Sequence, residues 1–171
     1  MGAPLVFVTV GTDHHPFHRM IGWVDGWLAS GAAGRARCLI QYGTSSKPKL
    51  GEGRDYLPYA EMEAAMREAA AVVCHGGPGS VMMARWLGKV PIVVPRRRAL
   101  GEHVDDHQLI FARRMATEGE VELVEDETRL REILDGVVEG RETLELSASR
   151  AETAESLARF ERLVEQLMSG R

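Results

Sequence analysis

The sequence has little that would set it apart from ordinary globular proteins. It contains only two cysteines, Cys38 and Cys74, which are too few for a disulfide framework, and each lies in an apolar run. We therefore expect two small buried thiols of a reducing compartment. Its 21 basic residues are outnumbered by 25 acidic ones, so the basic surface that nucleic-acid binding requires is missing. No apolar run approaches the ~18 residues of a membrane span, and no basic segment precedes the first run, so we expect no secretory signal.

What the sequence does contain is the length and composition of one folded domain. Its 171 residues are 44% hydrophobic and 27% charged. A chain of ~150 residues buries roughly 70% of its unfolded surface, which is enough for a sizeable core. We find no internal repeat, low-complexity segment or linker, so we expect residues 1–171 to form a single domain.

Short apolar runs alternate with helical patterns along the chain. The short runs predict strands at 5–10, 37–42, 56–59, 71–74, 91–94 and 121–124. Apolar residues at helical spacing predict helices at 17–29, 60–70, 78–87, 104–118, 127–138 and 151–168. This alternation predicts an α/β fold, with a doubly wound, mostly parallel sheet between two helical layers. The last helix has an apolar stripe, which packs on this domain or, alternatively, docks on a partner chain.

The most informative segment is VVCHGGPGS at 72–80, where a buried strand runs into a glycine-rich turn and then a helix. Ligands of open α/β sheets bind at the carboxyl ends of the strands. Free amides and the positive end of the dipole at a helix start favour an anion such as phosphate. The P-loop and dinucleotide patterns do not fit, because no Gly-Lys-Ser/Thr follows Gly77 and position 82 is Met82. We expect a phosphate-binding turn of another kind; alternatively, the glycines only allow a tight turn.

The loops after two other predicted strands would lie along the same edge of the sheet. They contain Gly11 and Thr12, and the segment RRRALGEHVDDHQ at 96–108. We expect the second loop to contact a ligand, and its three successive arginines to face a partner or a membrane rather than only solvent. The histidines of both loops match no zinc signature, so we expect no metal site and keep a metal hydrolase as a minor alternative.

Four motifs carry a resemblance to a known family. HGGPGSVMMARWLG, its continuation KVPIVVPRRRALGEHVDDHQ, VTVGT at 8–12 and IQYG at 40–43 together resemble the C-terminal domain of family 28 glycosyltransferases. More narrowly, the chain resembles the stand-alone subunit of two-component UDP-sugar transferases. Examples are PssE-like exopolysaccharide enzymes and the catalytic subunit of the dolichol-pathway UDP-N-acetylglucosamine transferase.

The resemblance implies a fold and a function. The fold is the Rossmann-like C-terminal half of a GT-B enzyme, whose active site lies between two such domains. The function is that of a donor-binding subunit, which moves a sugar from a UDP-sugar to a lipid-linked acceptor without a cofactor. A membrane-anchored partner would bind the acceptor and hold this cytoplasmic chain at the membrane face. The alternative is a non-catalytic module that senses UDP-sugars or scaffolds a polysaccharide synthase.

The resemblance assigns the diphosphate of the donor to two strand ends. These residues are Gly11 and Thr12 after the first strand, and Gly76, Gly77, Gly79 and Ser80 after the strand at 71–74. There the helix dipole would stabilise UDP as it leaves, without a metal ion.

The resemblance also assigns the rest of the donor. Tyr59 falls where the family lines its uracil pocket, although a core aromatic is an equal alternative. His107 and Gln108 correspond to the polar pair that reads the sugar hydroxyls. His75 and His103 belong to the motifs, and they either contact the donor or hydrogen-bond the loops.

One position departs from the family pattern. Met83 occupies the place, three residues after Ser80, of an acid that holds the ribose hydroxyls. Either donor affinity is weaker, or Glu102, Asp105 or Asp106 substitutes for the missing acid. No residue of this chain matches a general base, which we expect in the partner.

Overall fold

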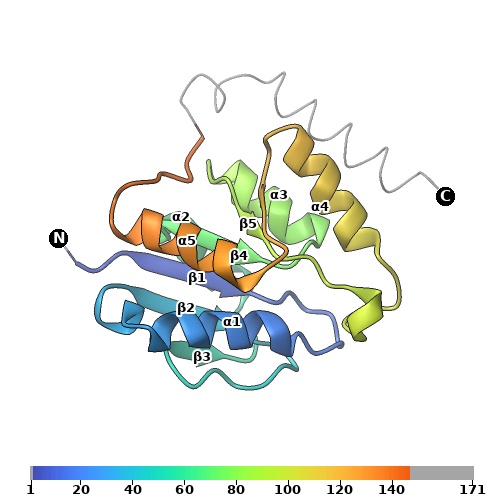
Figure 1. Cartoon of the computed structure of the whole chain (residues 1–171), viewed down its shortest axis with the longest axis horizontal. Helices are drawn as coiled ribbons and strands as arrows, with labels where there is room; N and C mark the ends of the chain where they lie inside the picture. Colours follow the sequence, from blue (N-terminus) through green and yellow to red (C-terminus); the bar gives the residue numbers. More distant parts are fainter. Residues whose placement is uncertain (1, 147–171) are drawn as a thin grey trace.

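The computed structural model describes residues 2–146, which form one sheet covered by helices (Figure 1). The strands are β1 (Leu5–Thr9), β2 (Arg37–Gln41), β3 (Glu52–Arg54), β4 (Ala71–Cys74), β5 (Ile92–Val93) and β6 (Glu122–Leu123). The α-helices are α1 (His18–Ala29), α2 (Tyr59–Glu68), α3 (Pro78–Trp86), α4 (His107–Thr117) and α5 (Glu127–Val138). Two short 3₁₀ turns, η1 (Ala32–Gly34) and η2 (Arg98–Leu100), lie in the connections.

The sheet is six-stranded and runs in the order β3-β2-β1-β4-β5-β6, with every neighbouring pair parallel. The chain adds β2 and β3 on one side of β1, then crosses back and adds β4, β5 and β6 on the other. This order is that of the dinucleotide-binding doubly wound fold, so the predicted α/β class is confirmed. The reversal places a topological switch point between β1 and β4.

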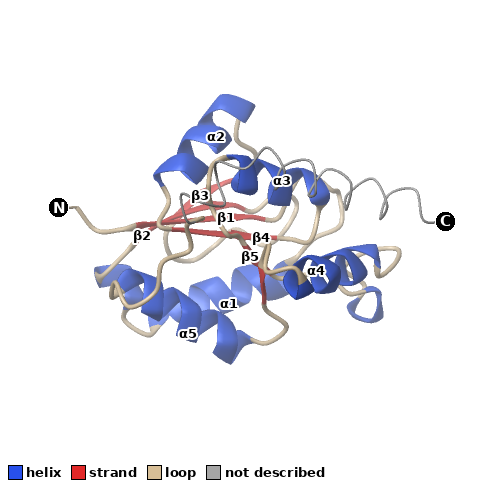
Figure 2. Ribbon diagram, turned by 90° about the horizontal axis from the view of Figure 1, so that it is seen from above, coloured by secondary structure: helices blue, strands red, loops and turns tan. Residues whose placement is uncertain are grey.

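The side chains of β1 alternate between two apolar cores. Val6 and Val8 are fully buried in a core that includes residues of α1 and α5, whereas Phe7 is fully buried among residues of α2 and α3. Figure 2 shows α2 and α3 above the strands and α1 and α5 below them. A strand buried on both faces needs a continuous apolar run, which explains why LVFVT was recognisable in the sequence.

The predicted third strand, at 56–59, is wrong. The structure instead places β3 at Glu52–Arg54, where no strand was expected, and begins α2 at Tyr59. β3 is a three-residue edge strand with exposed residues at both ends, so no apolar run marks it. An edge strand has a neighbour on one side only, and sequence patterning is weakest there.

The other elements predicted within residues 2–146 are confirmed, with shifts at their ends. The largest shift is at α4, which begins at His107 rather than at 104, because residues 101–106 form turns and bends before it. The predicted helix at 151–168 and its apolar stripe lie outside the described residues. No helix within residues 2–146 is long and apolar enough to cross a membrane.

Candidate functional site

The predicted phosphate-binding turn and the loop after β1 meet at the switch point. Thr9 and Cys74, the last residues of β1 and β4, are register partners, so both loops start at the same level of the sheet. The backbone N–H of His75 donates to the carbonyl oxygen of Thr9 at 3.3 Å, which extends the pairing by one residue. The carboxyl-end crevice at a switch point is where open α/β sheets bind ligands.

The glycines of the turn after β4 serve two different purposes. A β-carbon on Gly76 would lie 2.8 Å from the carbonyl oxygen of Gln108, and one on Gly77 would overlap the imidazole of His75. A β-carbon on Gly79 would meet nothing within 4 Å. The first two glycines therefore allow close packing within the protein, and only Gly79 leaves open space for a ligand.

His75 is a buried wedge between the two loops. Its ring occupies the space that a β-carbon would need on Gly77 and on Gly11, whose φ of +79° already favours glycine. Burial, with a contribution from the nearby Arg96 cation, lowers the pKa of His75 to about 4, so the imidazole is neutral at neutral pH. Its Nδ1 has no hydrogen-bond partner among the described residues. His75 thus positions the loops rather than presenting a base to solvent.

The helix start that follows offers backbone donors to an anion. Gly77 is the N-cap of α3, Pro78 begins the helix, and no side chain in the described part of the chain caps it. The N–H of Val81 is used by the carbonyl oxygen of Gly77 at 3.3 Å, so the earlier amides of Gly79 and Ser80 are the donors left for a ligand. These amides, the Ser80 hydroxyl and the helix dipole together make an anion-binding arrangement.

Arg96 holds the loops of the site together from within. It is fully buried, and its Nη atoms donate to the carbonyl oxygens of Val10 at 3.0 Å, His15 at 2.6 Å and Glu102 at 3.1 Å. Its guanidinium also stacks over the Phe17 ring, with the carbon 4.8 Å from the ring centroid. The expectation that this arginine faces a partner or a membrane is therefore wrong. A charged side chain in an apolar setting is unusual, but these carbonyl oxygens compensate for lost water.

The other two arginines of the run differ from Arg96. Arg97 is half-buried and forms an ion pair with Glu125 at 3.2 Å, whereas Arg98 is exposed. Only Arg98 keeps the exposure that contact with a partner would need.

Glu102, a candidate for the ribose contact, is an internal ion-pair partner. Its two carboxylate oxygens accept from Nε and Nη2 of Arg19 at 2.7 and 2.8 Å, and one of them also accepts from the N–H of Arg97. The side chain is only 8% exposed. This pairing accounts for Glu102 structurally and joins α1 to the loop after β5.

The remaining predicted residues of this loop lie at its exposed end. His107 is 75% exposed and its Nδ1 lies 2.7 Å from Oδ2 of Asp105. Hydrogen bonds from His107 lower the pKa of Asp105 below its ordinary value. Asp106 is exposed, and its side chain accepts from the backbone N–H of Arg98 at 3.0 Å. Asp106 and His107 are thus exposed to solvent at the start of α4.

Gln108 lies deeper, at the boundary between loop and core. It is buried, and its Oε1 accepts from the backbone N–H of Arg96 at 3.4 Å. This bond uses the oxygen of the amide and leaves its NH₂ group as the donor suited to a sugar hydroxyl.

Tyr59 is exposed to solvent, whereas Met83 is buried. Tyr59 is 64% exposed at the first turn of α2, so the alternative of a core aromatic is wrong. Met83 is 8% exposed and packs in the core under α2 and α3. No carboxylate occupies this place, and the methionine contributes to packing instead.

Sequence reasoning did not assign a role to Gln41, which organises the same edge. This buried residue ends β2, and its Nε2 donates to Oγ1 of Thr9 at 3.1 Å and to the carbonyl oxygen of Gly11 at 3.3 Å. Its Oε1 accepts from the N–H of Leu57 at 2.9 Å. A lone glutamine at the end of an apolar strand was the available signal, since a buried amide must find partners.

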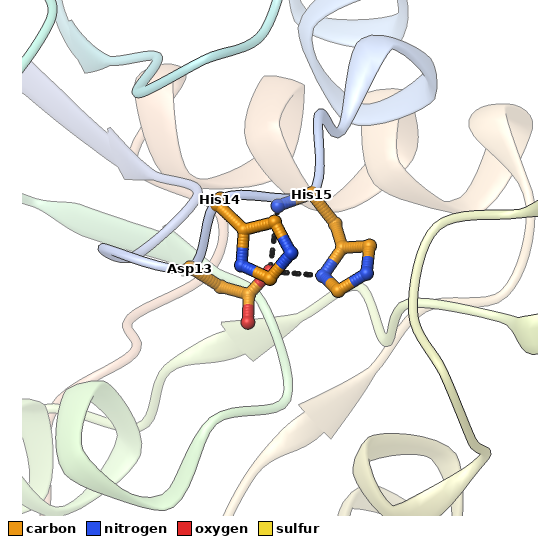
Figure 3. A group of neighbouring side chains, drawn as sticks. All are labelled: Asp13, His14 and His15. Carbon is orange, nitrogen blue, oxygen red and sulfur yellow. Dashed lines mark hydrogen bonds and ion pairs between the residues drawn. The ribbon is translucent and has the colours of Figure 1, made fainter.

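Asp13, His14 and His15 form a further cluster after β1 (Figure 3). Oδ1 of Asp13 lies 2.6 Å from Nδ1 of His15 and accepts from the His15 backbone N–H at 2.7 Å. Across the loop, Nε2 of His103 lies 3.8 Å from Oδ2 of Asp13. The cluster therefore joins the same two loops that Arg96 joins.

A cavity of about 480 Å³ lies elsewhere, along α2 beside β2 and β3. Its lining includes Cys38, Leu57 and Ala65 but none of the predicted donor-binding residues. Cys38 and Cys74 are both buried free thiols, as predicted, and burial raises the pKa of each to about 12.

The fold is that of the C-terminal, Rossmann-like half of GT-B glycosyltransferases. Residues 5–167 match the glycosyltransferase family 28 C-terminal domain, and the chain belongs to this family. It is thus a glycosyltransferase-type domain. No curated protein matches the chain.

Solved structures agree with this assignment at the level of the fold. The structure is similar to ALG13, with a TM-score of 0.63, 20% identity and 98% of each chain covered. It is also similar to the glycotransferase of kitacinnamycin, with a TM-score of 0.61 and 18% identity. A third similar structure is CalG4, the calicheamicin glycosyltransferase, with a TM-score of 0.56 and 15% identity. The kitacinnamycin match covers 97% of this chain but only 40% of that protein. The CalG4 match covers 98% of this chain but only 38% of that protein.

Proposed function

We propose that this chain is the donor-binding catalytic subunit of a two-component, inverting glycosyltransferase. In this proposal it moves a sugar from a UDP-sugar to a lipid-linked acceptor in polysaccharide biosynthesis. The observation that carries the proposal is the start of α3 at the switch point, which no described side chain caps and where a β-carbon at Gly79 would meet nothing within 4 Å. Family membership gives this anion-binding arrangement its role as the diphosphate site.

The chain's own residues would bind and orient the donor. The amides at the start of α3 and the loop at Gly11 and Thr12 would hold the diphosphate, and the helix dipole would stabilise the charge that develops on the leaving UDP. This stabilisation is built into the fold, so we expect donor binding without magnesium. Tyr59 would stack on uracil, and His107 and Gln108 would hydrogen-bond the sugar.

The base that activates the acceptor would come from a partner. His75 is unsuited to this role because it is buried between glycines and its pKa is lowered to about 4. In the two GT-B structures the matched segment is 40% or less of the protein, which leaves room there for a second domain. We propose that a membrane-anchored subunit supplies that half here, binds the lipid acceptor and holds this chain at the cytoplasmic membrane face.

A second candidate function rests on Met83. Because a methionine fills the core where the family places its ribose-binding acid, the chain could bind UDP-sugars as a sensing or scaffolding module without transfer. Release of UDP from a UDP-sugar, dependent on this chain and on membranes that contain its partner, would exclude the second candidate.

Amide chemical shifts of ¹⁵N-labelled protein test where the donor binds. On addition of UDP we expect shifts at Gly11, Thr12 and residues 76–81, with little change along α5. A matched pair of variants sharpens the result: Gly79→Ala puts a methyl group in the open space, whereas Gly34→Ala adds one at an open position in η1.

The pair has clear expected outcomes. Gly79→Ala should weaken UDP binding by at least about tenfold, the scale of one lost well-placed contact, and Gly34→Ala should leave it unchanged. Shifts confined to the cavity beside α2, or equal UDP affinity in both variants, would overturn the proposal.

A further inference from the structure

We propose that Asp13, His14, His15 and His103 form a binding site for a divalent transition-metal ion. The site would tie the loop after β1 to the loop before α4. The proposal does not rest on the proposed function. Asp13, His14 and His15 are assigned no donor contact, and His103, for which the resemblance leaves donor contact and loop bonding open, would act here as a metal ligand.

Geometry brings the ligands together. One ligand atom from each of Asp13, His14 and His15 can be chosen so that all three lie within 4.8 Å of one another (Figure 3). His103 comes from a loop about 90 residues later in the chain, yet its ring centroid is 5.4 Å from that of His15. Its Nε2 faces Oδ2 of Asp13 at 3.8 Å. Four groups that bind metals therefore converge from two loops.

The type of ligand selects the ion. Imidazole nitrogens with one carboxylate suit zinc, cobalt and nickel, whereas magnesium and calcium prefer oxygen ligands. Zinc–nitrogen bonds of about 2.0–2.1 Å place tetrahedral ligands roughly 3.4 Å apart. Oδ1 of Asp13 and Nδ1 of His15, now 2.6 Å apart, would therefore separate slightly, and Nε2 of His103, now 3.8 Å from Oδ2 of Asp13, would move closer. His14 is exposed, which leaves its ring free to turn toward the others.

Neighbouring groups orient the ligands and set the charge balance. Oδ1 of Asp105 lies 3.2 Å from Nδ1 of His103 without forming a hydrogen bond, so a small rotation would let it hold that nitrogen and leave Nε2 as the ligand, as carboxylates do for many metal-bound histidines. The positive charge of Arg96 would repel a bound cation, because its Nη1 donates to the carbonyl oxygen of His15, one of the proposed ligand residues, at 2.6 Å. The carboxylate of Asp13 is the group that offsets this charge, so binding should depend on it strongly.

The ion would reinforce the connection that Arg96 makes from inside. Arg96 joins the loops through Val10, His15 and Glu102, and the metal would join them at the surface through Asp13 and His103. Its role would be to fix the edge of the candidate donor site, with no part in the transfer step.

The test is titration of the metal-free full chain with Zn²⁺ by calorimetry and with Co²⁺ by visible absorption. We expect one ion per chain and the intense visible bands of a tetrahedral cobalt site. Asp13→Asn and His103→Asn should each weaken binding by more than about tenfold, as loss of a ligand or its support does. His18→Asn is the matched control, because this exposed histidine contacts Ser46 instead and should bind as the parent does.

Circular dichroism without metal would show that each variant is folded. No binding by the parent chain would overturn the proposal. So would affinity that survives both Asp13→Asn and His103→Asn, or that falls equally in His18→Asn, since these results describe an adventitious surface histidine site only.

Discussion

Gly76 packs against Gln108 so closely that a β-carbon at Gly76 would lie 2.8 Å from the Gln108 carbonyl oxygen and 2.9 Å from its β-carbon. The turn after β4 and the start of α4 thus share a boundary that only glycine permits. In the proposed site, one of these segments would bind the diphosphate and the other the sugar. Their contact therefore fixes the distance between the segment that would bind the diphosphate and the segment that would bind the sugar.

Gly76→Ala should therefore destabilise the fold, whereas Gly79→Ala should not. The added methyl at Gly76 meets backbone, which cannot rotate away, and we expect a loss of about 1–3 kcal/mol in unfolding free energy. At Gly79 the space is open, so the unfolding free energy should stay the same or rise by up to about 1 kcal/mol. Urea unfolding of both variants measures the difference, and equal stability would show that the contact with Gln108 is not tight.

Replacing Arg96 by methionine should loosen the loops of the site. The change keeps apolar volume but leaves the carbonyl oxygens of Val10, His15 and Glu102 without this donor, which should cost at least about 2 kcal/mol of stability. Hydrogen exchange should quicken in residues 10–15 and 102–108 while α5 keeps its protection. The control, Arg98→Met, alters an exposed arginine and should change stability by less than about 0.5 kcal/mol. Matching exchange in the two variants would contradict the role assigned to Arg96.

The buried His75 should make stability fall on acidification. The unfolded chain protonates this histidine near its ordinary pKa of 6.5, but the folded protein does so only near 4. Between these values the unfolded state binds more protons, so stability is full above 6.5 and is lost as pH falls toward 4. The expected loss is on the order of 3 kcal/mol for a shift of this size. His75→Gln should remove that part of the pH dependence, as urea unfolding across this pH range would show; parallel curves for parent and variant would argue against it.

The sequence predicted the edge of the sheet that carries the site, because parallel strands in a doubly wound fold all end there. Residues after β1, β4 and β5 could therefore be assigned to one region without knowing any contact. It did not predict β3, whose three residues at the sheet edge carry no apolar pattern. The structural roles of Gly76 and Arg96 could not be predicted either. Gly76 is constrained by Gln108, and Arg96 bonds the carbonyl oxygens of Val10 and His15, all distant in sequence.

The proposed metal site shows the same limit. Linear zinc signatures require ligands close together in sequence, whereas His103 reaches Asp13 only through the folding of two loops. Burial of Met83 is likewise a property of packing, and its sequence position marked only a departure from the family pattern.

Calorimetric titration of the isolated chain with UDP, UDP-N-acetylglucosamine, UDP-glucose and UDP-glucuronate, with and without magnesium, tests the proposed donor-binding role most directly. We predict that UDP binds once per chain and equally well without magnesium, and that the affinities of the UDP-sugars identify the sugar. If none of these compounds binds in either condition, the isolated chain is not a donor-binding subunit.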